Sequence, residues 1–248
     1  MKPLLRNIIA AAVGAASAIL LVVLDRESRR AEQPLTCSGV SVTILDSAKV
    51  SFITKDDVKK YILQEIGPWI GQKPDSLKLW KIEETLLSKQ AVLSCNAYLK
   101  GSRLFIDVMQ REPVVELEAA DGRFYADMSG YLFPVLPKYS CDVPLVKCDL
   151  QISDSKRQKW LSQMISMVDF TTRSKKWQNL FSGISADKEG DIVLTPCVGE
   201  EIFIFGQPIR IEEKFSKIEK YYQYIAHAEN SREYKSVNVS FKRQIICR

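Results

Sequence analysis

The stretch Gln110–Phe133, QREPVVELEAADGRFYADMSGYLF, decides the fold of the carboxyl-terminal part of this 248-residue chain. Apolar and polar residues alternate along it, as they do in strands with one buried face. The alternation breaks at Asp121-Gly122 and again at Ser129-Gly130, pairs that favour turns. Glycine reaches turn conformations that are closed to other residues, so Gly122 and Gly130 mark the hairpin ends. The stretch predicts antiparallel sheet and has no catalytic spacing.

The residues before this stretch predict a small two-layer domain. The spacing of apolar residues, with Gly101-Ser102 as a hairpin signal, gives the order strand, helix, helix, strand, strand. One sheet covered on one face by two helices can bury a complete core. The expected segments are residues 40–45, 55–66, 75–90 and two strands within residues 91–110.

The residues after Pro113 predict a second, mostly antiparallel sheet with helices, so the whole chain is assigned to the α+β class. The expected strands are residues 114–119, 123–128, 181–186, 191–196, 201–206, 234–241 and 243–248. Two helices are expected at residues 153–171 and 211–229. The second helix has an apolar stripe formed by Phe215, Ile218, Tyr222 and Ile225.

Residues 8–25 predict a membrane-spanning helix. Ile8–Leu24 contains no charge, and about 17 residues at 1.5 Å each span roughly 26 Å, close to the thickness of a bilayer core. A cleaved signal peptide is the alternative, because Lys2 and Arg6 precede the apolar run. The run ends in LVVL and DRESRR, which offers no small-residue cleavage site and favours an uncleaved anchor. Basic residues on both sides leave the orientation undecided. The flanking segments are a tail, residues 1–7, and a juxtamembrane linker, residues 26–36.

Composition points away from nucleic acid and metal chemistry. A net charge of +5, from 35 basic and 30 acidic residues, comes without a basic helix or a basic-aromatic stripe. The single histidine, His227, cannot form a multi-histidine metal site. Asp127 and Glu200 have no hydrolase spacing, and Asp127 before Ser129-Gly130 suits a turn-stabilising role better. We therefore expect no catalytic site, no cofactor, no metal, no small-molecule substrate and no nucleic-acid partner.

Six cysteines are compatible with an oxidising compartment but do not require one. Cys37 and Cys95 fall on neighbouring strands of the expected first domain, and Cys141 and Cys148 could close a small loop. Buried free thiols fit equally well, so the pairing stays open. The absence of a C-x-x-C motif argues against a thiol oxidoreductase.

Several segments, taken in order, resemble the FtsQ/DivIB family of bacterial cell-division proteins. DVMQREPVVEL, residues 107–117, is similar to the closing strand of that family's POTRA domain, and FYADMSGYLFP, residues 124–134, to the segment that follows it. VPLVKC, residues 143–148, departs from the family pattern because it lacks the glycine of a Pro-Leu-x-Gly run. Further segments that match in kind and order are IFIFGQ, EEKFSKIEKYY and YKSVNVSFKRQIICR.

The resemblance implies a POTRA domain (β-α-α-β-β) at residues 37–112 and a β domain at residues 113–248, both behind the membrane anchor. It implies a non-enzymatic divisome scaffold that links early and late septal proteins and binds the FtsB–FtsL complex through its carboxyl-terminal strands. Such a chain crosses the bacterial inner membrane once, with its amino terminus in the cytoplasm and its domains in the periplasm. Its POTRA domain could bind further divisome members. A POTRA-type protein of polypeptide transport or outer-membrane assembly is the alternative.

The last strands are the expected docking site. SVNVSF alternates, so that Val237, Val239 and Phe241 share one face. A strand near a chain end often lies at a sheet edge, whose unpaired N–H and C=O groups can accept a partner strand. An internal strand, or an edge blunted by neighbouring basic side chains, is the alternative. Under the docking interpretation, charge or proline at Val237 or Val239 should block recruitment more than it lowers stability. The expected partner-binding residues are Ser236, Val237, Asn238, Val239, Ser240, Phe241, Gln244, Ile245 and Ile246.

Arg111 and Pro113 lie where the first expected domain passes into the second. Proline cannot donate to a strand ladder, so Pro113 suits the end or the edge of a strand. Arg111 has two interpretations of equal weight: a charge pair that fixes the angle between the domains, or a solvated charge at a strand end.

Overall fold

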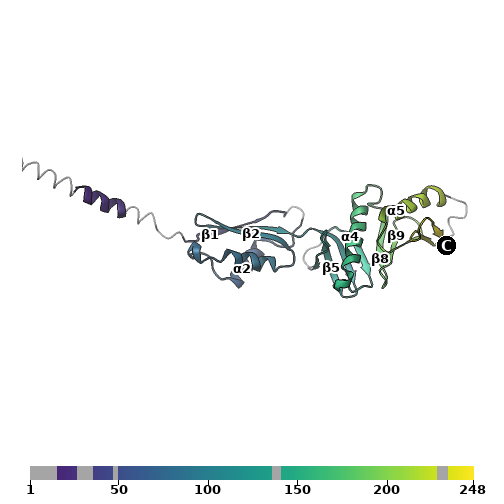
Figure 1. Ribbon diagram of the computed structural model, residues 1–248, viewed down its shortest axis with the longest axis horizontal. Helices are drawn as coiled ribbons and strands as arrows, with labels where there is room; N and C mark the ends of the chain where they lie inside the picture. Colours follow the sequence, from purple (N-terminus) through teal and green to yellow (C-terminus); the bar gives the residue numbers. More distant parts are fainter. Residues whose placement is uncertain (1–15, 27–35, 47–49, 136–140, 228–233) are drawn as a thin grey trace, which may run out of the picture. The chain divides into compact units, whose positions relative to one another are not determined.

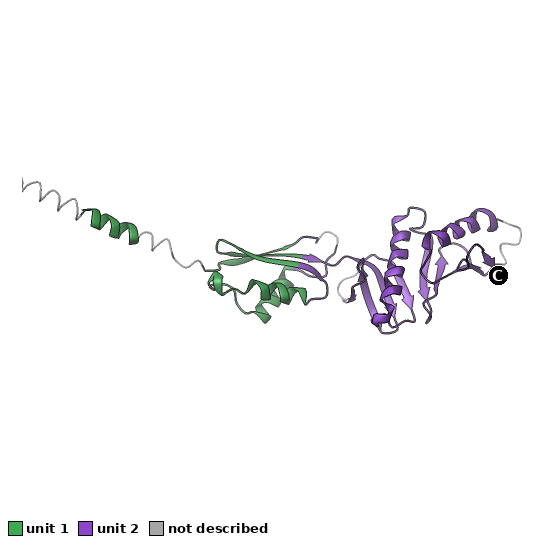
Figure 2. Cartoon of the chain, in the orientation of Figure 1, with its two compact units in different colours: residues 1–44, 55–88, 95–108 green, residues 45–54, 89–94, 109–248 purple. Residues whose placement is uncertain are grey.

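The computed structural model describes residues 16–26, 36–46, 50–135, 141–227 and 234–248, and Figure 1 shows its ribbon. The chain divides into two compact units, coloured separately in Figure 2. Unit 1 comprises residues 1–44, 55–88 and 95–108, and unit 2 comprises residues 45–54, 89–94 and 109–248. The boundaries predicted for the tail, anchor, linker, POTRA domain and β domain stay predictions.

The expected membrane helix is described in part. Residues 16–26 are helical and exposed, whereas residues 1–15 and 27–35, which include the rest of the expected span, the tail and most of the linker, lie outside the described residues. Among the helices that the structure describes, none combines the length and the apolar character needed to cross a bilayer.

The first sheet has three strands within the described residues, in the order β1-β3-β2. Strand β1 runs parallel to β3, and two helices pack with this sheet in the predicted order strand, helix, helix, strand, strand. Val58 and Ile62 on one helix, and Ile82 and Leu86 on the other, recur at helical spacing and are fully buried. The elements are β1 (Gly39–Ile44), α2 (Lys55–Glu65), the 3₁₀ turn Pro74–Ser76, α3 (Leu79–Leu87), β2 (Val92–Lys100) and β3 (Arg103–Gln110).

Strand β2 is an edge of this sheet, and α3 covers one of its amides. The Glu83 carboxylate accepts a hydrogen bond from the Ala97 N–H at 2.8 Å. An open edge strand nine residues long would present a row of unpaired donors to any other strand. At Ala97, the Glu83 carboxylate therefore accepts the hydrogen bond that a neighbouring strand would otherwise accept from β2.

Glu83→Ala should free the Ala97 N–H, lower the free energy of unfolding by about 1 kcal/mol, and promote self-association through β2. Urea unfolding measures the first effect, and light scattering over a concentration series measures the second. Glu84→Ala, at the exposed neighbouring position, is the matched control. A Glu83→Ala chain that stays as monodisperse as this control would contradict this role of Glu83.

The second sheet, within the described residues, has nine strands in the order β12-β11-β10-β9-β8-β7-β4-β5-β6. Five of the eight neighbouring pairs are antiparallel and three are parallel, so the expectation of a mostly antiparallel sheet is confirmed. The strands are β4 (Pro113–Ala119), β5 (Gly122–Asp127), β6 (Leu132–Pro134), β7 (Leu145–Cys148), β8 (Phe181–Ala186), β9 (Ile192–Pro196), β10 (Ile202–Gly206), β11 (Ser236–Asn238) and β12 (Ile246–Cys247).

Helices α4 (Gln158–Arg173) and α5 (Ile211–Lys220) cover the same face of this sheet. Helix α4 joins the parallel strands β7 and β8, and α5 joins the parallel strands β10 and β11. Both crossovers move toward β12, and crossovers of the usual right hand then place both helices on one side, as the shared core shows. Phe215 of α5 lies at the centre of this core, with ring-centroid distances of 5.1 Å to Phe170, 5.0 Å to Trp177 and 5.3 Å to Phe205.

The helix predicted at residues 211–229 changes its winding part-way. Helix α5 ends at Lys220, and the next turn, Tyr221–Ile225, is a π-helix. The wider turn holds an extra residue and rotates the apolar stripe. As a result Tyr221 is buried, Tyr222 is half-buried and Tyr224 is exposed, whereas the sequence pattern assigned only Tyr222 to the core.

Candidate functional site

Within the described residues, strand β12 is one edge of the nine-stranded sheet, and β6 is the other. Strand β12 pairs antiparallel with β11, with Val237 opposite Cys247 and Asn238 opposite Ile246, and the described chain places no strand beyond it. Ser236 and Arg248 exchange two backbone hydrogen bonds, each of 2.9 Å. Because hydrogen-bonded and non-bonded pairs alternate in an antiparallel ladder, the N–H and C=O of Cys247 point away from β11. The main chain at Cys247 is therefore open for another strand.

The expected edge position of residues 236–241 is wrong. Strand β11 lies between β10 and β12, and the strand ends at Asn238. The crossover through α5 pairs β11 in parallel with β10, and the last residues then return along its other side. Val237 and Val239 are 0 % exposed, so charge at either position would disrupt the core itself, and such variants cannot separate recruitment from folding.

Asn238 explains why β11 is short. Its Oδ1 atom accepts hydrogen bonds from the Ser240 N–H at 2.9 Å and from the Ser240 hydroxyl at 2.7 Å. This local side-chain arrangement turns the backbone out of the ladder. Phe241 is 46 % exposed, Gln244 is exposed, and Ile245 and Ile246 are half-buried.

The uncovered face of the sheet carries apolar side chains toward the β12 edge. The register aligns Val193 of β9, Ile204 of β10, Asn238 of β11 and Ile246 of β12 in one row across four strands. Val193, Ile204 and Ile246 are half-buried, and no helix described in unit 2 covers this row. A partner strand added beside β12 would extend the row with its own alternate side chains.

Arg111, just before β4, forms a charge pair, which is the first of its two interpretations from the sequence. Its Nη1 atom donates to Asp127 Oδ2 at 2.7 Å, and its guanidinium lies 3.7 Å from the centroid of the Tyr131 ring. The Arg111 side chain is only 15 % exposed, so its interpretation as a solvated charge is wrong. Pro113 is the first residue of β4, opposite Asp127 in the register, as a residue without an N–H requires. That these residues fix the angle between the domains stays a prediction.

Asp127 stabilises a turn, as the sequence predicted. Its Oδ1 atom accepts hydrogen bonds from the Ser129 N–H at 2.9 Å, the Ser129 hydroxyl at 2.5 Å and the Tyr131 N–H at 3.1 Å. Burial alone would raise the pKa of the Asp127 carboxyl, but the hydrogen bonds from Ser129 and Arg111 outweigh burial and lower this pKa. These hydrogen bonds favour the anionic carboxylate and fit its role in stabilising the turn.

Family comparisons agree with the division of the chain into a POTRA-like part and a carboxyl-terminal sheet. A family model described as FtsQ/DivIB, C-terminal related, matches residues 112–248, which is more than half of the chain. The chain belongs to the FtsQ/DivIB family. A POTRA-like domain model matches residues 35–108. A comparison with curated proteins found no match. The resemblance read from the sequence is confirmed, and the FtsQ/DivIB family is one of non-enzymatic division proteins that are in general membrane-anchored.

Gln110 is a structural residue of this FtsQ/DivIB chain that sequence reasoning missed. It is 1 % exposed, and its Oε1 atom accepts hydrogen bonds from the N–H groups of Phe52 and Ile53, both at 2.8 Å. Its Nε2 atom donates to Val50 O at 3.0 Å. Phe52 in turn contacts the Tyr125 ring at a centroid distance of 5.6 Å. The only sequence signal was a polar residue at the end of an alternating strand, which does not predict burial.

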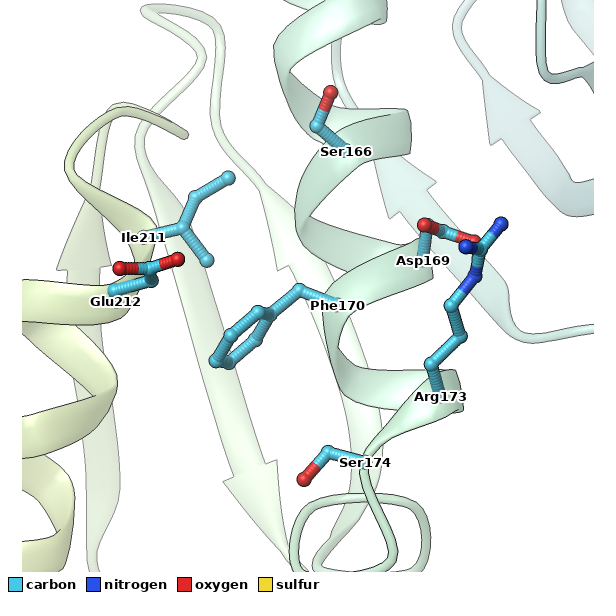
Figure 3. A pocket seen from close by; sticks show the side chains of 7 residues that line it. All are labelled: Ser166, Asp169, Phe170, Arg173, Ser174, Ile211 and Glu212. Carbon is cyan, nitrogen blue, oxygen red and sulfur yellow. The ribbon is translucent and has the colours of Figure 1, made fainter.

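A hollow lies between α4 and α5 on the helical side of the sheet (Figure 3). It measures about 480 Å³, and Phe170 and Ile211 point toward each other across it. Its two carboxylates do not form a catalytic pair, since Asp169 is bound to Arg173 at 2.7 Å. The remaining lining residues are Ser166, Ser174 and Glu212.

Burial raises the pKa of two thiols and a phenol in this chain, so these groups are protonated at neutral pH. None of the six cysteines, all in the described part of the chain, is bridged. Burial, helped by Glu83, raises the pKa of the Cys95 thiol to about 12, and burial raises that of Cys148 to about 11. Burial also raises the pKa of Tyr221 to about 12. His227 is exposed, and the described residues contain no cluster suited to a metal ion.

The Asp127 turn gives a pH-dependent contribution to stability. Asp127→Asn should lower the free energy of unfolding at pH 7 by about 1–3 kcal/mol, because it weakens charge-assisted hydrogen bonds to Arg111 and Ser129. The pKa of Asp127 is lowered in the folded chain, so its contribution is complete above the unfolded value of about 4 and is lost as pH falls through the folded pKa.

Urea unfolding of both chains between pH 7 and pH 2.5 measures this effect as a gap that narrows toward acid. Asp142→Asn, which changes an exposed carboxylate, should leave stability unchanged at every pH. A gap of constant size down to pH 2.5 would show that the Asp127 charge has no role.

Proposed function

We propose that this chain is a non-enzymatic divisome scaffold that binds the FtsB–FtsL complex by adding a partner strand to the β12 edge. The observation that carries the proposal is the outward main chain of Cys247 at the end of the nine-stranded sheet. Backbone hydrogen bonds to this edge would supply affinity, and the row of Val193, Ile204 and Ile246 beside it would favour apolar side chains in the partner. FtsB and FtsL are the partners that the family resemblance implies.

The same proposal assigns the chain to the bacterial inner membrane as a single-pass protein, with its amino terminus in the cytoplasm and its folded units in the periplasm. The apolar run in residues 8–25 and the family's general membrane anchorage support this arrangement. The family match over residues 112–248 favours a role in division over one in polypeptide transport.

The structure of unit 1 supports docking at β12 rather than at β2. Glu83 already bonds the Ala97 amide on β2, whereas the outward N–H and C=O of Cys247 face away from their own sheet. The POTRA-like segment, residues 35–108, would then contact other divisome members through side chains rather than through strand addition.

Cys247→Pro tests the edge directly. Proline removes the thiol and the backbone N–H that points outward from β12, whereas it keeps the preceding residue in the extended region, so the contact with β11 should survive. Cys247→Ala removes the same thiol and keeps the N–H, which makes it the matched control. We expect Cys247→Pro to raise the Kd for the purified FtsB–FtsL complex at least about tenfold, and Cys247→Ala to stay within about twofold.

Binding is measured by interferometry on the full chain in detergent or nanodiscs, and thermal unfolding monitors the fold of each variant. If Cys247→Pro is folded and binds FtsB–FtsL as tightly as Cys247→Ala, strand addition at β12 is wrong.

A further inference from the structure

Helix α5 grips the backbone that leads from β11 to β12. The Lys217 ammonium is bound to Val239 O at 3.3 Å and donates a second hydrogen bond to Phe241 O. Lys217 is only 7 % exposed, so its charge is held mainly by protein groups rather than by water. A buried cation is costly unless it is paired and hydrogen-bonded, which indicates a specific use of these contacts.

Two further residues near the start of α5, Arg210 and Glu213, bind the same backbone segment. Arg210 Nη2 donates to Ser240 O at 2.8 Å. Glu213 accepts from Lys217 at 3.0 Å and from Arg210 at 3.3 Å, and it also accepts the backbone N–H of Arg243. Together the three side chains bond main-chain atoms at positions 239, 240, 241 and 243.

The backbone near these contacts adopts unusual conformations at three positions. Arg210 and Arg243 have φ values of +53° and +64°, and they are the non-glycine residues with positive φ in the described chain. Gly206, at φ +70°, lies so close to Ser240 that an added Cβ would be 2.9 Å from the Ser240 Cβ atom. Such conformations cost free energy and persist where surrounding contacts hold them, often at functional sites.

A second buried lysine fixes the other side of this close approach. Lys214 donates to Phe205 O and to Gln207 O, each at 2.7 Å. Burial, together with the neighbouring cations Arg210 and Lys217, lowers the pKa of Lys214 to about 8. The segments that follow β10 and β11 are therefore both hydrogen-bonded to lysines of α5.

We propose that Arg210, Glu213 and Lys217 form a clamp, here called the α5 clamp, that positions β12 for an incoming strand. This inference rests on the proposed docking at β12. The clamped positions, 239–241 and 243, lie in the link between β11 and the two-residue strand β12, residues 239–245, so the clamp determines where β12 returns to the sheet. Arg210, Glu213 and Lys217 are positioning residues, since they act through the backbone that they hold.

Strand β12 is so short that contacts outside the sheet are needed to keep it in place. Two residues give few ladder bonds, so an untethered β12 would leave the sheet often. A partner that binds only the ordered edge has an apparent Kd equal to its intrinsic Kd divided by the fraction of chains in which the edge is ordered. Releasing the clamp should thus weaken binding mainly by slowing association.

The test compares Lys217→Met, Lys217→Arg and Lys220→Met in the full chain. Lys217→Met keeps the apolar stem and removes the donor, Lys217→Arg keeps a long cation, and Lys220→Met changes an exposed lysine of the same helix. Hydrogen exchange should accelerate at least about tenfold in residues 239–248 of Lys217→Met, with the first sheet unchanged. The same variant should bind FtsB–FtsL about tenfold more weakly, through slower association, whereas Lys217→Arg and Lys220→Met should behave nearly as wild type.

An unchanged rate of hydrogen exchange in residues 239–248 of Lys217→Met would overturn the clamp. Faster exchange with an unchanged rate of association with FtsB–FtsL would overturn its positioning role. If Lys217→Met does not fold, Glu213→Gln takes its place in the test. The Glu213 side chain is 38 % exposed, so the fold should tolerate the loss of its charge. Hydrogen exchange in residues 239–248 and the association rate with FtsB–FtsL are then measured on Glu213→Gln. A wild-type chain that does not bind FtsB–FtsL at all would overturn the proposed docking, whereas normal wild-type binding matched by Lys217→Met would overturn the α5 clamp alone.

Discussion

The parallel pairing of β10 with β11 is the constraint on which the carboxyl-terminal part depends. A parallel neighbour requires a crossover, and α5 supplies it above the sheet. Once β11 lies beside β10, the remaining residues can only return antiparallel along its far side, which leaves β12 as the last strand. The buried valines of β11, the π-turn after Lys220 and the lysine contacts to the two strand ends all follow from accommodating this crossover.

The two faces of the nine-stranded sheet have different roles. The face under α4 and α5 holds the aromatic core around Phe215, which makes the sheet rigid. Near β12, the other face carries polar and half-buried apolar side chains that no described helix of the unit covers, whereas at β5 and β6 it holds the buried rings of Tyr125 and Phe133 against Phe52. A rigid support with an accessible edge fits an adaptor, because backbone recognition needs an ordered template and little catalytic chemistry.

Much of this fold could be predicted from the sequence, because local patterns encode it. The hairpin at Asp121-Gly122 and the Asp127 turn follow from alternation and turn chemistry. Strand β7 was missed because four residues, LVKC, give too little alternation, and its parallel partners are far away in sequence. The edge was assigned to β11 instead of β12 since alternation shows which face a residue takes but not which strand lies beside it. The lysines of α5 read as an ordinary polar helix face, and only tertiary packing shows that Lys214 and Lys217 are buried.

The contact between Glu83 and the Ala97 amide has a consequence for the composition of any complex. β2 is nine residues long and β12 only two, so an unblocked β2 would be the stronger template for strand addition. A chain that accepted strands at both β2 and β12 could bind its neighbours at two places, and such head-to-tail contacts can grow into open-ended rows. If β12 binds a partner strand as proposed, the bond from the Ala97 amide to Glu83 would disfavour such additional contacts along β2 and so favour complexes of fixed stoichiometry.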